Sequence, residues 1–174
     1  MSTKLRQSGF TLIELLVTLV IVAILLAIGV PSFSNFIKDN RRTTQVNDLI
    51  TAFNLARSEA IKRGVPVTVC QSDDGETCTN SAWEGGWIIF ADSRDSLGNR
   101  AAGEELLRVR ESLTSSSTLR GDKDFISYFP DGLSNSTGLF TLCDDRGAGQ
   151  AKAVEINATG RPTASNNGGT LTCP

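Results

Sequence analysis

Residues 9–30 read GFTLIELLVTLVIVAILLAIGV, and this apolar stretch determines how the rest of the chain is interpreted. Between residues 10 and 30 the only ionisable side chain is that of Glu14. A helix of these 21 residues rises roughly 31 Å, which matches the hydrocarbon thickness of a bilayer. Lys4 and Arg6 precede the stretch without any acid, so the N-terminus is expected on the cytoplasmic side. The sequence therefore predicts a membrane-spanning helix over residues 10–30.

Two simpler explanations of this stretch are a cleaved secretory signal and a plain membrane anchor. Residues 27–29, Ala-Ile-Gly, imitate a signal cleavage site, but the apolar region of such signals is shorter, at about 7–15 residues. A carboxylate inside a membrane helix costs about 3 kcal/mol or more unless it is paired, so Glu14 argues against a plain anchor. Cleavage after Gly9 would free an α-amino group on Phe10, one helical turn from Glu14. That amine could pair with its own Glu14 or with that of a neighbouring subunit.

Residues 9–17, GFTLIELLV, resemble the class III leader junction of type IV prepilins and type II secretion pseudopilins. The resemblance implies that prepilin peptidase removes a leader of residues 1–9 by cutting after Gly9. It also implies N-methylation of Phe10 and a docking role for Glu14 in the growing filament. Pro31 falls where pilin-like helices often kink.

Apolar residues continue at helical spacing beyond Pro31, so the helix is expected to extend over residues 31–63 as an amphipathic half. The apolar positions are Phe33, Phe36, Ile37, Val46, Leu49, Ile50, Phe53, Ala56, Ala60 and Ile61. At Pro31 we expect a kink or local melting, because proline removes one backbone hydrogen bond. Gly64 and Pro66 end the helix. Its apolar face must then be covered by the remaining chain.

Basic residues on this half are interleaved with acids, which favours a solvated face over a phosphate-binding or lipid-binding stripe. They are Arg41, Arg42, Arg57, Lys62 and Arg63.

Residues 64–174 change to short β-rich runs separated by Gly, Asp, Asn and Ser. The runs are 65–70, 87–90, 106–109, 125–129, 139–143, 153–156 and 170–173. A helix that leads into consecutive strands predicts an α+β domain with an antiparallel sheet or sandwich.

Four cysteines, Cys70, Cys78, Cys143 and Cys173, permit three disulfide pairings. An even number beyond a membrane helix fits an oxidising compartment. Proximity in the sequence favours Cys70–Cys78 together with Cys143–Cys173. A zinc site is disfavoured, because the chain has no His and no CxxC spacing.

Five short motifs beyond the helix resemble the GspH/FimT family of pilin-like proteins. They are WEGGWIIFAD (83–92), GEELLR (103–108), FPDG (129–132), FTLC (140–143) and INATGR (156–161). With the leader motif, the resemblance spans nearly the whole chain and implies a type IV pilin-like fold, with the long helix packed on the β domain. The family includes FimU-type minor pilins, the H pseudopilin of type II secretion and FimT-type minor pilins that bind DNA. Core and turn roles account for most of these Trp, Phe and Gly positions.

Composition argues against an enzyme. The chain has no His, and its 17 Lys+Arg against 19 Asp+Glu give no general attraction to nucleic acid. Without His there is no Ser-His-Asp or Cys-His arrangement, and no phosphate-binding glycine motif is present. We therefore expect no catalytic residue, no cofactor and no metal.

DNA binding is the main alternative from another functional class. DNA-binding relatives share a Gly-Arg-x-Arg motif, whereas this chain reads Gly160-Arg161-Pro162-Thr163. The second arginine is missing and no basic residue follows Arg161, so DNA is not the expected partner.

The sequence and the resemblance together predict a minor pilin of a Gram-negative bacterium. It would enter the inner membrane as a single-pass prepilin with a periplasmic C-terminal domain, and would then join a type IV pilus at the cell surface, at or near the tip, where it primes assembly. Expected partners are other minor and major pilins, prepilin peptidase, the inner-membrane assembly platform and, before assembly, lipid. The alternatives are an H-type pseudopilin of type II secretion and a FimT-like minor pilin for DNA uptake.

Overall fold

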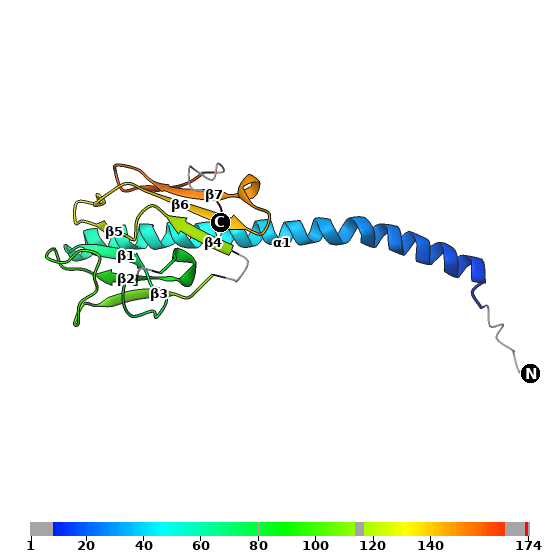
Figure 1. Ribbon diagram of the computed structural model, residues 1–174, viewed down its shortest axis with the longest axis horizontal. Coiled ribbons are helices and arrows are strands. Elements are labelled where there is room, and N and C mark those ends of the chain that lie inside the picture. The colour runs from blue at the N-terminus through cyan, green and yellow to red at the C-terminus, as the bar shows by residue number, and fades with distance from the viewer. Residues whose placement is uncertain (1–8, 80, 114–116, 166–172, 174) are drawn as a thin grey trace, which may run out of the picture. The chain divides into compact units, whose positions relative to one another are not determined.

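The computed structural model describes residues 9–79, 81–113, 117–165 and 173 (Figure 1). The chain divides into two compact units, residues 1–40 and residues 41–174. One long helix, α1 (Leu12–Arg63), belongs to both, because the division falls inside it. The second part of α1 therefore forms a unit with the strands that follow it.

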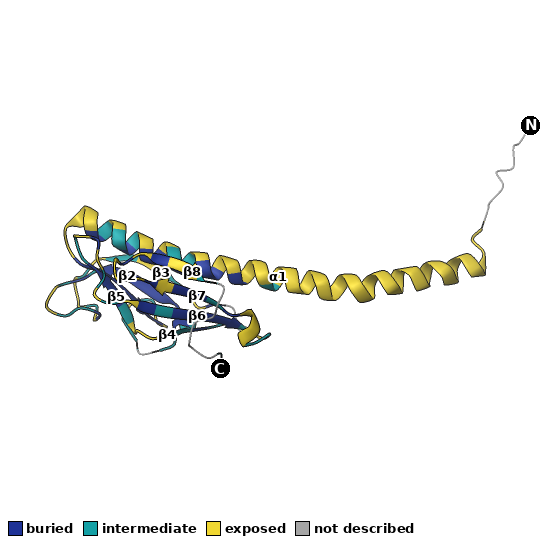
Figure 2. Ribbon diagram, turned by 90° about the horizontal axis from the view of Figure 1, so that it is seen from above, coloured by how far each residue is buried: buried dark blue, intermediate teal, exposed yellow. Residues whose placement is uncertain are grey.

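In the first unit, α1 runs without interruption through Pro31. As predicted, the helix continues past this proline, and its backbone stays helical there. A kink at Pro31 stays a prediction. Side chains of this part of the helix are exposed, and Figure 2 colours it accordingly. Phe33, Phe36 and Ile37 are among them, so the prediction that the β domain covers these three is wrong. Within α1, the first buried residue is Arg42.

In the second unit, α1 presents a buried stripe at helical spacing. Its members are Arg42, Gln45, Val46, Leu49, Ala52, Phe53, Ala56 and Ala60. The helix ends at Arg63, as predicted, and Gly64 follows with a φ of 71°. The amide of Gly64 donates a hydrogen bond to the carbonyl of Ala60 at 3.0 Å, which satisfies one carbonyl of the last turn. Ile61, predicted to lie on the covered face, is 54% exposed, because it lies one position off the buried stripe that ends at Ala60.

Eight strands in the described residues form two four-stranded antiparallel sheets, which confirms the predicted α+β class. The first sheet has the order β3-β2-β1-β5. Its strands are β1 (Val67–Gln71), β2 (Trp87–Ala91), β3 (Leu106–Arg110) and β5 (Phe125–Tyr128). The second sheet has the order β4-β6-β7-β8. Its strands are β4 (Ser117–Gly121), β6 (Gly138–Asp144), β7 (Lys152–Ile156) and β8 (Pro162–Ser165). Two short 3₁₀ helices are η1 (Trp83–Gly85) and η2 (Ala148–Gln150).

The predicted β-rich runs correspond to β1, β2, β3, β5, β6 and β7, but β4 and β8 were not predicted. Both are edge strands of the second sheet and are largely polar, so they lack the apolar signal of a central strand. The run 170–173 falls mainly outside the described residues.

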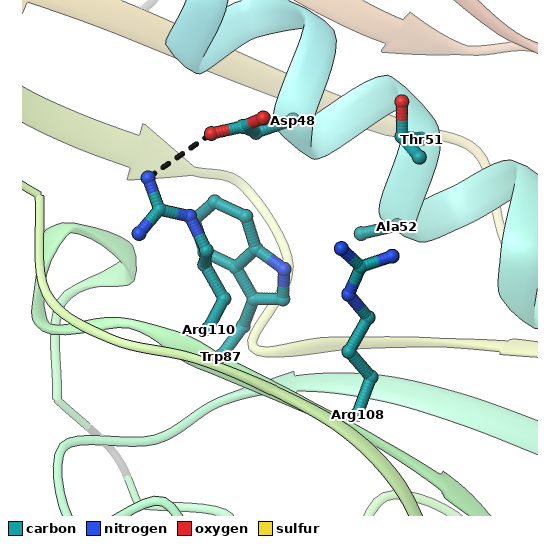
Figure 3. Close-up of a pocket in the computed structure, with 6 residues that line it drawn as sticks. All are labelled: Asp48, Thr51, Ala52, Trp87, Arg108 and Arg110. Carbon is teal, nitrogen blue, oxygen red and sulfur yellow. Dashed lines mark hydrogen bonds and ion pairs between the residues drawn. The ribbon is translucent and has the colours of Figure 1, made fainter.

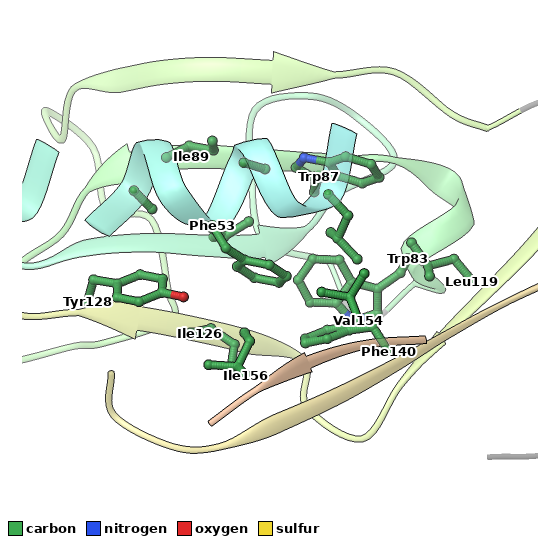
Figure 4. Close-up of a cluster of buried hydrophobic side chains, with 14 of the residues drawn as sticks. Phe53, Trp83, Trp87, Ile89, Leu119, Ile126, Tyr128, Phe140, Val154 and Ile156 are labelled. Carbon is green, nitrogen blue, oxygen red and sulfur yellow. The ribbon is translucent and has the colours of Figure 1, made fainter. Parts of the chain in front are cut away.

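The main core joins α1 to the inner faces of both sheets (Figure 4). Phe53 on α1 packs against Phe140 on β6 with ring centroids 5.0 Å apart, and Trp83 packs edge-on against Phe140 at 4.9 Å. A smaller cluster of Cys70, Ile88 and Phe90 is buried separately, with Cys78 packed against it.

Both predicted disulfides are present. Cys70 pairs with Cys78 and Cys143 with Cys173, with Cα–Cα distances of 5.6 and 5.8 Å. The second bond ties the C-terminal end of the chain to β6.

Candidate functional site

The predicted cleavage site lies just before α1 begins. Gly9 and Phe10 are exposed and lie outside the helix, and the Phe10 side chain is 87% exposed. A Cβ added at Gly9 would meet no heavy atom within 4 Å. Exposed, non-helical backbone is the kind that proteases cut. The Gly9–Phe10 bond is therefore accessible to a peptidase.

Thr11 caps the start of α1. Its carbonyl accepts a hydrogen bond from the amide of Leu15 at 3.2 Å, and its Oγ1 accepts one from the amide of Glu14 at 3.3 Å. A threonine followed three residues later by glutamate is the sequence of a capping box, and the side-chain bond of Thr11 is one half of that arrangement. The cap defines where the helix begins relative to the cleavage site.

Glu14 lies in the first turn of α1 with an exposed side chain. Its carboxylate makes no ion pair with any other side chain of the described ranges. A negative charge in the first turn is favoured by the positive end of the helix dipole. The carboxylate is thus available to a cation from another chain or to an amine created at Phe10.

Beyond Glu14 the helix surface is apolar and exposed. Eleven large apolar side chains between Leu15 and Ile28 are 48–68% exposed; they are Leu15, Leu16, Val17, Leu19, Val20, Ile21, Val22, Ile24, Leu25, Leu26 and Ile28. By length and composition, α1 can cross a membrane. Such a surface is stable in lipid or against other apolar helices.

Arg161, the predicted site of any DNA contact, lies in the turn between β7 and β8. Gly160 precedes it with a φ of 75°. The Arg161 amide donates to Asn157 Oδ1 at 3.0 Å, and its carbonyl accepts from the Asn157 amide at 3.3 Å. Arg161 is therefore a residue of the turn that leads into β8. Pro162, which follows it, begins β8.

Two buried polar clusters hold the second unit together and were not recognised in the sequence. In the first, the Thr68 hydroxyl bonds to the Asp92 carboxylate and lies 2.5 Å from the Ser127 hydroxyl, while the Gly98 amide donates to Asp92 Oδ2 at 3.0 Å. Burial raises the pKa of Asp92. These bonds join β1, β5 and the end of β2.

The second cluster contradicts the prediction that Arg42 is solvated, since this arginine is 7% exposed. Arg42 Nη1 lies 4.0 Å from Asp144 Oδ2, and Arg146 Nη2 lies 2.6 Å from the same oxygen. Hydrogen bonding from Arg146 lowers the pKa of Asp144. Among the residues that the structure describes, there is no group of three or more His, Cys, Asp or Glu suited to a metal.

Comparison with known families and proteins agrees with this architecture. The family model described as type II transport protein GspH matches residues 45–160, and the prokaryotic N-terminal methylation motif matches residues 4–30. The chain is 44% identical over 48 residues to the prepilin peptidase-dependent protein D of Escherichia coli (strain K12). That match covers 28% of this chain and 30% of the relative's length.

Two solved structures share the fold. The type IV minor pilin FimU of Pseudomonas aeruginosa (strain PAO1) superposes with a TM-score of 0.59 at 18% identity, over 75% of this chain and 92% of FimU. The minor pseudopilin EpsH from the type 2 secretion system of Vibrio cholerae superposes with a TM-score of 0.52 at 11% identity, over 74% of this chain and 98% of EpsH. The first is named as a minor pilin and the second as a minor pseudopilin. Because the family model covers about two thirds of the 174 residues and the methylation motif matches the N-terminal region, this protein belongs to the GspH family and is a type IV minor pilin or pseudopilin.

Proposed function

We propose that this protein is a minor pilin of a type IV pilus, processed after Gly9 and incorporated at or near the pilus tip, where it primes assembly. The observation that supports processing and incorporation into a filament is the start of α1. There, an exposed Gly9–Phe10 bond, a capped first turn with an exposed Glu14 and a long apolar surface follow one another within one segment.

Before assembly, residues 10–30 would cross the inner membrane once, with Lys4 and Arg6 in the cytoplasm. Residues 41–174 would then lie in the periplasm, an oxidising compartment that fits the Cys70–Cys78 and Cys143–Cys173 disulfides. Prepilin peptidase and an inner-membrane assembly platform are the partners at this stage.

Cleavage after Gly9 changes the charge at the helix start. The new α-amine of Phe10 lies within one turn of Glu14, and its N-methylation keeps a positive charge there. In a filament, the amine of one subunit can neutralise Glu14 of the next, which removes the penalty for a carboxylate in an apolar surrounding. The pairing also fixes the axial register between two helices.

The apolar surface of α1 allows the transfer from lipid to filament. Its side chains move from lipid tails to the apolar helices of other pilins, so they stay in an apolar surrounding throughout. Selectivity must then come from close packing and from polar pairs such as Glu14 with an amine.

A subunit of a type II secretion pseudopilus is the second candidate. The name of the family, type II transport protein GspH, and the shared fold of EpsH favour it. Pilus and pseudopilus subunits need the same helix start, so the two candidates differ in the filament that incorporates the protein.

Mass spectrometry of the N-terminus tests processing. Protein purified from cells with prepilin peptidase should begin at N-methylated Phe10, and protein from cells without the peptidase should retain residues 1–9. A Gly9→Val variant should retain the leader in both strains. A mature N-terminus beyond residue 27 would indicate a secretory signal and overturn the proposal.

Fractionation distinguishes the two filaments. A pilus subunit should be found in sheared surface pili, and its deletion should leave type II secretion of exoproteins unchanged. Loss of secretion with normal piliation would support the pseudopilin alternative.

A further inference from the structure

A pocket of about 80 Å³ opens where α1 crosses the edge of the first sheet (Figure 3). Its lining residues come from α1, β2 and β3, all within the second unit. They are Asp48, Thr51, Ala52, Trp87, Arg108 and Arg110. We call it the Arg108 pocket.

The pairing of β2 with β3 builds the floor of this pocket. Trp87 lies opposite Arg110 and Ile89 lies opposite Arg108, so both arginines share the face of the sheet on which Trp87 lies. Gly86, which precedes Trp87, allows the backbone to lie close to Arg110. Its φ is 118°, and a Cβ there would lie 2.4 Å from the carbonyl oxygen of Arg110.

Arg110 already has a carboxylate partner. Its Nη2 lies 3.0 Å from Asp48 Oδ2, and its guanidinium carbon lies 5.9 Å from the centroid of the Trp87 ring. Arg108 extends toward Thr51 and Ala52 on the other side of the indole (Figure 3). It has no hydrogen bond or ion pair with any residue that the structure describes.

The Trp87 indole N–H also lacks an acceptor among the described residues, although the side chain is only 2% exposed. The other tryptophan differs, because Trp83 Nε1 donates to the carbonyl of Lys123 at 2.8 Å. In Figure 3 the edge of the Trp87 ring that carries Nε1 faces the side on which Arg108 lies. The nitrogen itself is not among the fully buried polar atoms of the described residues that lack a partner, so it stays accessible from the pocket. The N–H is therefore a donor directed into the pocket, where the guanidinium of Arg108 also has no partner among the described residues.

We propose that the Arg108 pocket binds the carboxylate of an Asp or Glu side chain from a neighbouring pilin subunit. Arg108 supplies charged donors and Trp87 supplies a neutral one, a set that suits two carboxylate oxygens. With Arg108 and Arg110 against Asp48, the lining carries one net positive charge. A pocket of about 80 Å³ has room for a carboxylate and ordered water.

The position of the pocket and the assembly of pilins identify the source of this carboxylate. β3 is an edge strand of its sheet, so another chain can approach the pocket from outside. The choice of a neighbouring subunit rests on the proposed function, in which the protein packs among other pilins.

The direct test is a titration followed by NMR on ¹⁵N-labelled full-length protein in detergent micelles. The two indole N–H signals are distinguished by the contact of Trp83 with Phe140. The ligand is acetyl-Gly-Glu-Gly-amide, and the neutral control is its Gln analogue. We expect the Trp87 signal to shift with the Glu peptide alone, with a Kd in the millimolar range, while the Trp83 signal stays in place.

Two arginine variants make the test specific. Arg108→Gln should weaken binding at least tenfold. Arg94→Gln is the matched control, because Arg94 is also exposed and without a partner among the described residues, and it should bind as the wild type does. Equal binding by Arg108→Gln and wild type, or no Trp87 shift at all, would overturn the proposal. A larger shift with a single-stranded oligonucleotide than with the Glu peptide would indicate that the pocket binds phosphate and not a carboxylate. That result would also overturn the proposal.

A second measurement separates this proposal from the proposed function. In cells, Arg108→Gln should be processed normally but retain fewer neighbouring pilins in a pull-down than Arg94→Gln does. If both variants retain neighbours equally, the pocket proposal fails while the pilin function stands. If the wild-type chain itself is neither processed nor found in pili, the proposed function fails.

Discussion

Thr11 and Glu14 are joined by a hydrogen bond of 3.3 Å, in which the Glu14 amide donates to Thr11 Oγ1 at the start of α1. The Glu14 carboxylate, for which we propose a docking role, is therefore carried by a turn that Thr11 stabilises. This cap defines the first turn before any filament contact exists, so the position of Glu14 relative to Thr11 is set in the free subunit.

Removing the cap should loosen that turn. An N-cap hydroxyl contributes about 1 kcal/mol, so Thr11→Val should speed hydrogen exchange at the Glu14 amide about fivefold in detergent micelles. Thr11→Ser keeps the hydroxyl and should exchange at nearly the wild-type rate. Equal exchange in wild type and Thr11→Val would show that the cap has no energetic role.

The two disulfides should contribute unequally to stability. They close loops with sequence separations of 8 and 30 residues. On the chain-entropy model these correspond to about 2.5 and about 3.6 kcal/mol. Replacing Cys143 and Cys173 by serine should therefore lower the unfolding free energy more than replacing Cys70 and Cys78. Denaturant unfolding followed by tryptophan fluorescence measures both, and the reverse order would contradict the prediction.

Asp144 should make the fold sensitive to acid. The hydrogen bond from Arg146 lowers the pKa of Asp144 in the folded state. Its contribution is complete above the unfolded pKa, near 4, and is lost as pH falls through the lower folded pKa. Asp144→Asn should remove about 2 kcal/mol at pH 7 and flatten the loss below pH 4. The exposed Asp95→Asn is the control. An unchanged acid profile in Asp144→Asn would argue against this assignment.

Asp92 should affect the pH dependence of folding stability in the opposite direction to Asp144. Burial raises its folded pKa, so the folded state holds the proton more tightly than the unfolded state does. Stability therefore falls as pH rises from the unfolded pKa through the folded one. Asp92→Asn keeps an oxygen for Thr68 and Gly98 but carries no charge, so its melting temperature should vary less between pH 4 and 7. A steeper dependence than in the wild type would refute the assignment.

The sequence predicts best what depends on local pattern. The helix, its end at Arg63 and the nearest-neighbour disulfides follow from spacing, and the structure confirms them. β4 and β8 escaped prediction because edge strands need little apolar surface, and their partners β6 and β7 provide the pairing.

Long-range pairing explains the other misses. The burial of Arg42 depends on Asp144, which lies about a hundred positions further along the chain. The Arg108 pocket depends on the β2–β3 register and on where α1 crosses it. Neither the pairing of Arg42 with Asp144 nor the place where α1 crosses β2 and β3 can be predicted from a single sequence. Phe33, Phe36 and Ile37 were missed for another reason. Their helical spacing was recognised correctly, but the β domain was wrongly expected to cover them.

The most direct test of the central claim is the number of surface pili on a strain that lacks the gene, complemented with the wild-type gene or with Glu14→Ala. If the protein primes pilus assembly through its intramembrane carboxylate, the deletion strain should have few pili. The wild-type gene should restore them, and Glu14→Ala should do so poorly despite equal protein levels. Normal piliation in the deletion strain, or full rescue by Glu14→Ala, would contradict the account.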